Sequence, residues 1–292
     1  MNILKNSGIE WIGNIPSEWE INKIKNVANV YTGNSISDDD KGLYSDKDDA
    51  FPYIATKDIN IIDNTIDYEN GMYTKIKDKK FKIAHTGDTL LCIEGGNAGK
   101  KIARLNQNVS FVNKLCCFNP KIIDSNYLYY SIMSDSFTEP FKQNIFGLIG
   151  GVSQSVIRQF NICIPNVKEQ HLIADFLDEK VNTIDNIICE LNSQIEILNK
   201  YKKQLISESV TEGLSKKNFK NSKISFIKKI PDNWEEVRTI NVLKMPITDG
   251  PHETPDLYDD GIPFVSAEAV SCGNGRIDFE HIRGYISEDY YR

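Results

Sequence analysis

The sequence predicts a mixed α/β (α+β) domain, then a long coiled-coil helix, then an incomplete second copy of the domain. Three observations predict this order. Short apolar runs alternate with turns over residues 1–165, a heptad pattern follows, and the opening segment of the chain recurs later. The chain has 292 residues, of which 40% are hydrophobic and 26% charged, so about two globular domains are expected.

Composition also narrows the class of protein. Six cysteines form no C-x-x-C pair, and no apolar run reaches 18 residues, so we expect a reduced, cytoplasmic protein without a membrane partner. The formal net charge is −7, and most of the acidic excess lies in residues 223–292. Binding to nucleic acid therefore requires a local basic surface in the first part of the chain.

The first domain is assigned to residues 1–165. Two of its apolar runs, residues 89–93 and 160–164, are typical of buried strands, and Gly, Asn and Asp mark the turns between such runs. A helix is expected over residues 125–144, with Leu128, Ile132 and Phe137 on one side. Residues 38–49 are expected to form a solvated acidic loop.

A helical spacer is assigned to residues 166–213. Its start is marked by Asn166 followed by Glu169 at capping-box spacing, and its end by Gly213. At 1.5 Å per residue such a helix is roughly 70 Å long and needs a partner helix. The seam that we expect to form a coiled-coil interface comprises Leu177, Val181, Ile184, Ile188, Leu191, Ile195, Leu198 and Leu205, with Ala174 before it and Lys202 at one seam position.

An internal repeat defines the last part of the chain. Ile15-Pro16 and Trp19-Glu20 return as Ile230-Pro231 and Trp234-Glu235, at a constant offset. Residues 214–222 are therefore assigned as a linker, and residues 223–292 as an incomplete second copy of the domain.

Catalytic residues are not predicted. The loop at residues 95–101 lacks the spacing and the Ser/Thr of a P-loop, and the four histidines have no metal-ligand spacing. Two acid-x-Lys matches, at residues 78–80 and 178–180, lack the strand context of a nuclease. No cofactor and no metal site is expected on this chain.

Candidate DNA-binding residues are found in three segments. Residues 75–82 carry five lysines against one aspartate, and lysines neutralise phosphates without regard to sequence. A glycine-rich loop follows, and polar side chains able to bond base edges occur near residues 147–158. A solvated charged face and ordinary turn residues are the alternative interpretations. The candidates are Lys75, Lys77, Lys79, Lys80 and Lys82; Asn97, Lys100, Lys101 and Arg104; and Ser153, Gln154 and Arg158.

Together these features resemble the specificity subunit of type I restriction-modification enzymes. The motifs that carry the resemblance are Ile15-Pro16-x-x-Trp19, Gln154-Ser155-Val156-Ile157, Ile162-x-Ile164-Pro165, Glu169-Gln170-x-x-Ile173-Ala174-x-x-Leu177-Asp178, Ile184-Asp185, Leu205-Ile206, Val210-Thr211-x-Gly213, Thr248-Asp249-Gly250-Pro251-His252-x-x-Pro255 and Gly261-Ile262-Pro263-Phe264.

The resemblance implies a non-catalytic DNA-recognition subunit. In that family each target-recognition domain binds one half of a split double-stranded DNA sequence, and helices set the distance between the halves. Modification (methyltransferase) subunits dock on it, a restriction subunit joins the complex, and S-adenosylmethionine, ATP and Mg belong to those partners. Because residue 292 lies about 70 residues into the second copy, we expect a subunit truncated within its second target-recognition domain, which self-associates through its coiled coil or needs a complementing fragment.

Two other functions remain open. A coiled-coil adaptor or recombination cassette of the same system would bind DNA weakly and without sequence preference. The recognition part of a single-chain nuclease-methyltransferase would require its catalytic block on a separate polypeptide.

Overall fold

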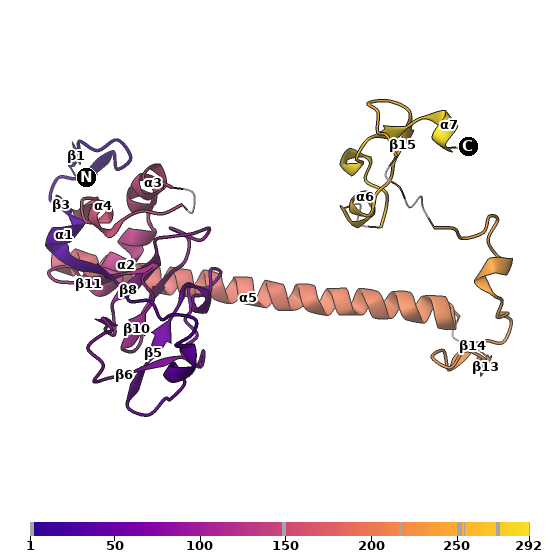
Figure 1. Cartoon of the computed structure of the whole chain (residues 1–292), viewed down its shortest axis with the longest axis horizontal. Helices are drawn as coiled ribbons and strands as arrows, with labels where there is room; N and C mark the ends of the chain where they lie inside the picture. The colour runs from indigo at the N-terminus through magenta and orange to yellow at the C-terminus, as the bar shows by residue number, and fades with distance from the viewer. Residues whose placement is uncertain are drawn as a thin grey trace. The chain divides into compact units, whose positions relative to one another are not determined.

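The computed structural model describes residues 3–147, 150–215, 218–249, 253, 255–272 and 275–291 (Figure 1). Contacts divide the chain into two compact units, Met1–Leu198 and Asn199–Arg292. The mixed α/β class with a long helix is confirmed. Among the described residues, no helix is long and apolar enough to cross a membrane.

A four-stranded antiparallel sheet forms the centre of the first unit. Its order is β4-β11-β8-β9, and its middle strands β11 and β8 coincide with apolar runs. The strands comprise Ala28–Thr32 (β4), Leu115–Pro120 (β11), Thr89–Cys92 (β8) and Ile102–Arg104 (β9).

Both faces of this central sheet are buried, each in a different apolar cluster. In β11, Cys116 and Phe118 belong to the cluster formed with the helices, whereas Leu115 and Cys117 belong to the cluster formed with the second sheet. Successive side chains of a strand point to opposite faces, so a strand covered on both sides consists almost entirely of apolar residues. This burial raises the pKa of the Cys116 thiol to about 12.

A second sheet covers one face of the first. Its order is β6-β5-β10-β7, and β10 runs parallel to β5 but antiparallel to β7. Gly33, which follows β4, packs directly on this sheet: a Cβ at position 33 would lie only 1.8 Å from the carbonyl oxygen of Phe111. The strands comprise Tyr73–Lys75 (β6), Ala50–Ile54 (β5), Val109–Phe111 (β10) and Ile83–Ala84 (β7).

Helices cover the other face of the central sheet. The single helix expected over residues 125–144 is wrong, because α2 (Ser125–Met133) ends at Ser134 and α3 (Asp135–Gln143) starts anew. Ser134 has extended backbone angles, φ −75° and ψ 159°, and so interrupts the helical hydrogen bonding. The third helix of this face, α4, is the single turn Gln154–Ile157.

Short elements complete the first unit. β1 (Leu4–Asn6) pairs with β2 (Asn14–Pro16), and β3 (Glu20–Lys23) pairs with β12 (Asn161–Ile164). The remaining elements are α1 (Ile24–Val27), η1 (Lys41–Tyr44) and η2 (Thr56–Asp58), of which η1 lies inside the predicted acidic loop.

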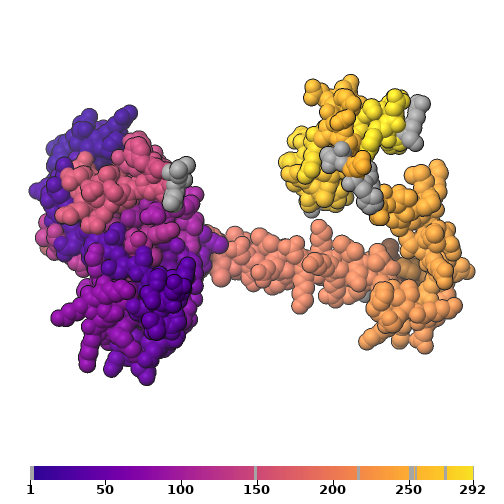
Figure 2. Space-filling view, viewed as in Figure 1, coloured from indigo at the N-terminus to yellow at the C-terminus, as the bar shows by residue number. Residues whose placement is uncertain are grey.

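The long helix α5 comprises the 46 residues Val167–Glu212. The predicted start is confirmed, since the Glu169 amide donates to Asn166 Oδ1 at 3.0 Å. Gly213 follows the helix with φ +68°, as a C′ glycine does. Within the first unit, no other segment covers the middle of the helix (Figure 2), and Ile184, Leu191 and Ile195 are more than half exposed.

The second unit contains a structural copy of the first hairpin. β13 (Phe219–Asn221) pairs with β14 (Lys229–Pro231) in the register of β1 and β2, at the offset of the sequence repeat. Its other elements are η3 (Thr239–Asn241), β15 (Ile262–Pro263), α6 (Ala267–Cys272), η4 (Phe279–His281), β16 (Tyr285–Ile286) and α7 (Glu288–Tyr291). Of the motif at residues 248–255, Gly250, Pro251, His252 and Thr254 lie outside the described residues.

We expect Gly33→Ala to destabilise the first unit by about 1–3 kcal/mol, because the new methyl group collides with the Phe111 backbone. Chemical denaturation measures this loss. The matched control is Gly42→Ala, where an added Cβ has no atom within 4 Å and should leave the denaturation midpoint unchanged. Equal midpoints for the two variants would contradict the packing described here.

Candidate nucleic-acid interface

One end of the central sheet collects loops from three strands. Thr32 ends β4 and pairs with Cys116, while Cys92 ends β8 and pairs with Leu115. These pairings place the end of β4, the end of β8 and the start of β11 at the same edge, which we call the Thr32 end. Loops that leave this end therefore lie beside one another.

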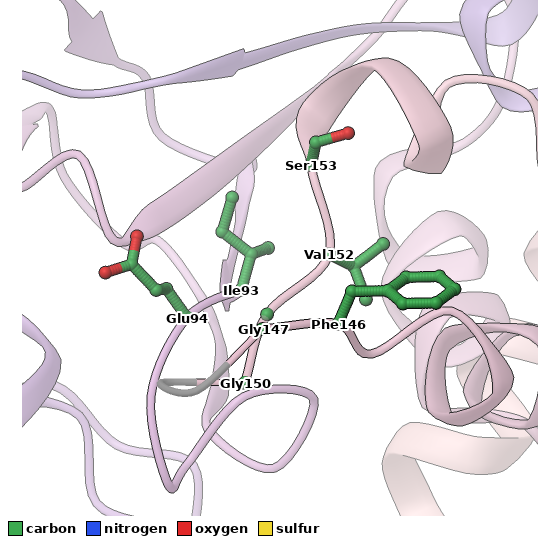
Figure 3. A pocket seen from close by; sticks show the side chains of 8 residues that line it. Ile93, Glu94, Phe146, Gly147, Gly150, Val152 and Ser153 are labelled. Carbon is green, nitrogen blue, oxygen red and sulfur yellow. The ribbon is translucent and has the colours of Figure 1, made fainter.

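A hollow of ≈ 470 Å³ opens at the Thr32 end, between the segment after β8 and a glycine-rich loop (Figure 3). Backbone bonds join its walls: the Gly95 amide donates to Gly150 O at 2.8 Å, and the Val152 amide donates to Ile93 O at 2.9 Å. Figure 3 shows Glu94 and Phe146 on opposite sides of this hollow. The glycines allow backbone to approach closely, so a flat or extended ligand can reach the walls.

The lysine segment at residues 75–82 meets the Thr32 end only at its last residue. Lys82 Nζ donates to the Thr32 carbonyl oxygen at 2.9 Å. Lys75 lies on β6 and forms an ion pair with Asp46 at 2.6 Å, which offsets its charge. Lys80 Nζ lies 5.5 Å from the centre of the Phe81 ring.

Lys77 and Lys79 lie in the exposed turn after β6. No carboxylate of the described residues comes within ion-pair distance of their ammonium groups. Their charges therefore remain available to an external anion such as phosphate.

The loop between β8 and β9 carries three candidates. The carbonyl of Asn97 accepts the Lys100 amide at 3.0 Å, which shapes the turn. Lys100 is exposed, and its Nζ donates to Gly96 O at 3.3 Å. Lys101 is half-buried, and its Nζ donates to Thr56 O at 2.8 Å. Lys100 is thus the more accessible cation of this loop.

Arg104 is placed apart from the other candidates. It pairs with Thr89, at the opposite end of β8 from Cys92. Its Nη2 donates to Asp178 of α5 at 3.1 Å, and its guanidinium carbon lies 5.4 Å from the Tyr129 ring centre. Arg104 therefore contacts α5 and α2 within the first unit, and it lies at the opposite end of the central sheet from the Thr32 end.

Asp178 holds two side chains at once. Besides Arg104, it accepts the hydroxyl of Tyr130 at 2.7 Å. Desolvation and this bond raise the pKa of Tyr130 above its ordinary value, so the phenol stays protonated and keeps donating. Asp178 therefore anchors the start of α5 to both α2 and β9.

The third set of candidates begins at the top of the hollow. Ser153 caps α4 by accepting the Val156 amide, and its hydroxyl lies 2.8 Å from that of Ser155. Gln154 Nε2 donates to Val30 O at 2.6 Å, which uses one of its two N–H groups, so the side-chain amide keeps a donor and an acceptor for other groups. Arg158 is exposed at the other end of α4.

Sequence reasoning missed residues that line or adjoin the hollow. Lys114 precedes β11 and lies 3.8 Å from Glu94, and Phe146 is 75% exposed. Neither residue belongs to a cluster of similar residues in the sequence. Lys114 is a single lysine between two apolar runs, and Phe146 is a single phenylalanine before a glycine-rich loop, so no sequence pattern identifies them. Among the described residues, no group of three or more His, Cys, Asp or Glu side chains is placed so that it could hold a metal ion.

Comparison with known proteins gives a consistent result. The family model "Type I restriction modification DNA specificity domain" matches residues 16–197. The MjaVIII type I restriction enzyme specificity subunit of Methanocaldococcus jannaschii is 28% identical over 94% of this chain and 60% of its own length. The putative MjaX specificity subunit of the same organism is 29% identical over 88% of this chain and 61% of its own length.

A solved structure supports the fold. A chain described under "Structural basis underlying complex assembly and conformational transition of the type I R-M system" superposes with a TM-score of 0.54 at 16% identity. The match covers 72% of this chain and 49% of that one. This chain thus spans about 60% of the length of the curated relatives it matches.

We expect Asp178→Asn to lower the free energy of unfolding by about 1–3 kcal/mol, since it removes the charge that pairs with Arg104. Thermal or urea unfolding measures the change. Glu179→Gln is the neighbouring control, because among the described residues the ion-pair partner of Glu179 is the exposed Lys180, so the change should matter little. A similar loss in both variants would show that the Arg104 contact is unimportant.

Proposed function

The chain belongs to the family of type I restriction-modification DNA specificity domains, and we propose that its first unit recognises one half of a split DNA sequence. The observation that carries the proposal is the family match, which covers nearly all of this unit. Loops collected at one end of a rigid sheet are also the usual place for binding residues.

We place the DNA against the Thr32 end. Lys82 and the exposed Lys100 of the loop after β8 would neutralise phosphates there, and the exposed lysines in the turn after β6 would contact phosphates beyond that end. Polar groups at and next to the hollow, among them Ser153 and the side-chain amide of Gln154, would then contact base edges. In this arrangement Lys75 and Arg104 support the fold, because both are engaged by carboxylates of the chain.

The partners that we propose follow from the family. Modification (methyltransferase) subunits would dock on the chain, and a restriction subunit would join the assembled complex. S-adenosylmethionine, ATP and Mg would then be bound by those subunits, so this chain would supply recognition without catalysis. We also propose that it works in the cytoplasm, where its DNA substrate is found.

The seam of α5 supports self-association. Apolar side chains left in water on a helix favour pairing with another helix. An antiparallel pair of identical seams would be self-complementary, because each copy offers the same row of apolar positions to the other. Two first units would then be held apart by a helix pair of fixed length, one for each half of a DNA target.

The adaptor function remains the second candidate. It is favoured by the same exposed seam, which needs a helical partner whether or not the first unit binds DNA. The two functions differ in sequence preference and in the number of DNA-bound units.

We expect the double variant Lys79→Ala/Lys80→Ala to weaken DNA binding uniformly across sequences. It should also reduce the slope of log affinity against log salt by about 2, since each phosphate contact contributes about 0.9. Fluorescence anisotropy with duplex DNA at several salt concentrations measures both.

The matched control for this variant is Lys25→Ala/Lys121→Ala. It removes the same charge at the opposite end of the central sheet, where Lys121 Nζ bonds the Lys25 carbonyl at 3.1 Å. It should leave the salt slope unchanged. A control that lowers the slope as much as the test variant would refute the proposed phosphate contacts of the lysines after β6.

Selection of random duplex DNA tests the proposed function directly. The chain is co-expressed with its modification subunit, and bound DNA is sequenced. We expect an enriched motif of two equal halves at fixed spacing, because each copy of the chain binds one half. A stable protein complex without any enriched sequence would support the adaptor function instead.

A further inference from the structure

A carboxylate lies at the edge of the hollow, on the surface where we place DNA. Glu94 follows β8 and lines the hollow together with Ser153 (Figure 3), and its side chain is 42% exposed. DNA phosphates repel a carboxylate, so a negative charge at this position opposes the sequence-independent part of DNA binding. Recognition of a base edge is the role in which a carboxylate favours DNA binding.

The backbone around Glu94 is held in place on both sides. Ile93 O accepts the Val152 amide and the Gly95 amide donates to the glycine-rich loop, as described above. The Ile93 amide also donates to Lys114 O at 3.0 Å, which joins this segment to the start of β11. Because hydrogen bonds fix both of its neighbours, Glu94 presents its carboxylate from a defined position.

The carboxylate of Glu94 accepts no hydrogen bond from the described residues. The ammonium group of Lys114, with which it forms an ion pair, lies 3.8 Å away, beyond hydrogen-bond distance. Gly151 leaves room for the side chain, because a Cβ at position 151 would lie 3.5 Å from Glu94 Cγ and 2.9 Å from Ile93 O. Both carboxylate oxygens therefore keep their acceptor positions for a ligand.

An ionised carboxylate only accepts hydrogen bonds, and this property selects one base edge in the major groove. Cytosine presents its N4 amine, which is a donor. Adenine presents its N6 donor beside the N7 acceptor, whereas guanine presents the acceptors O6 and N7 and thymine the acceptor O4. Acceptors repel a carboxylate, so the edge of cytosine matches Glu94 best.

The walls of the hollow strengthen such a bond. Ile93 and Val152 line it with apolar side chains, and Phe146 lies across from Glu94 (Figure 3). A base that covers the hollow displaces water from these apolar groups. A hydrogen bond to an ionised group is stronger where water does not compete for it.

We propose that Glu94 is a base-recognising residue, which accepts a hydrogen bond from the N4 amine of one cytosine in the DNA half-site. The inference rests on the proposed function, because it requires the Thr32 end to face DNA. Lysines supply affinity for any sequence, whereas Glu94 lowers the affinity for sequences without cytosine at this position. The hydrogen bond to cytosine offsets the repulsion between the carboxylate and the phosphates, so Glu94 contributes discrimination between sequences.

Selection of random duplex DNA tests the proposal by comparing the wild type with Glu94→Gln, each co-expressed with the modification subunit. Gln has nearly the same shape, but it lacks the charge and its amide also donates, so other bases become acceptable. We expect a C·G pair at one position of the wild-type motif. The variant should reduce the preference for that pair by about tenfold or more and keep the rest of the motif.

Fluorescence anisotropy with the full chain gives a second result, in which the two expected effects have opposite signs. With a random-sequence duplex, Glu94→Gln should bind about twofold or more tightly than the wild type, because a charge that repels phosphates is removed. With the selected duplex, the variant should bind more weakly than the wild type. A residue that only supports the fold would weaken both.

A change in the DNA covers the case in which Glu94→Gln does not fold. The cytosine of the selected duplex is replaced by 2-pyrimidinone, which lacks the N4 amine. This replacement should weaken binding of the wild type by about tenfold. Unchanged affinity of the wild type would overturn the proposal.

Glu179→Gln is the matched control, since it makes the same chemical change on α5, beside the Asp178 that bonds Arg104 at the other end of the sheet. It should leave the motif and both affinities unchanged. If the wild type and Glu94→Gln enrich the same motif with the same preferences, recognition by Glu94 is overturned while the proposed function stands. If the wild type enriches no sequence, the proposed function fails and the inference fails with it.

Discussion

The attachment of the first turns of α5 to the first unit determines how every other part of this protein can act. Gln170 is 1% exposed, donates to Pro165 O at 2.8 Å and accepts the Asp124 amide at 2.9 Å. Ala174 belongs to the same core as the sheet, and one turn later Asp178 bonds Arg104 and Tyr130. Because three successive turns are fixed, the helix direction relative to the central sheet is fixed too. In the proposed dimer, a seam that begins on such a helix would set the orientation of the two recognition units.

Much of this architecture is predictable from the sequence, for identifiable physical reasons. A helix of 46 residues is favoured by an N-cap residue, by a C′ glycine and by the absence of Pro and Gly from its interior. All three features can be identified in the amino-acid sequence. The buried strands β8 and β11 are visible because both of their faces are apolar. The break at Ser134 is not visible, because a serine between two good helical segments carries no signal until its backbone is seen to be extended.

The candidate site is less predictable than the fold. Lys75, Lys79 and Arg104 are equivalent as charges in a sequence, yet their environments differ. Lys75 lies beside Asp46, Arg104 lies beside Asp178, and Lys79 has neither. Which cations stay available depends on carboxylates up to 74 positions away in the chain. Likewise, the sequence suggests that the Gln154 side chain is available to a ligand. In the structure, its Nε2 donates a hydrogen bond to the carbonyl oxygen of Val30, which lies on a distant strand. Contacts of long sequence separation, which no local pattern encodes, decide these roles.

The charge of the protein makes pairing and recognition interdependent. With a formal net charge of −7, the chain as a whole repels DNA, so in the proposed function attraction would have to come from a few exposed lysines of the first unit. A handful of phosphate contacts gives weak and strongly salt-dependent binding, so one unit alone is a poor DNA ligand. In the proposed dimer, two units on one rigid helix pair would make the second contact intramolecular and would raise the total affinity without new contacts. In the proposed dimer, access to the α5 seam would therefore control DNA binding, because the low affinity of each unit would leave recognition dependent on the pair.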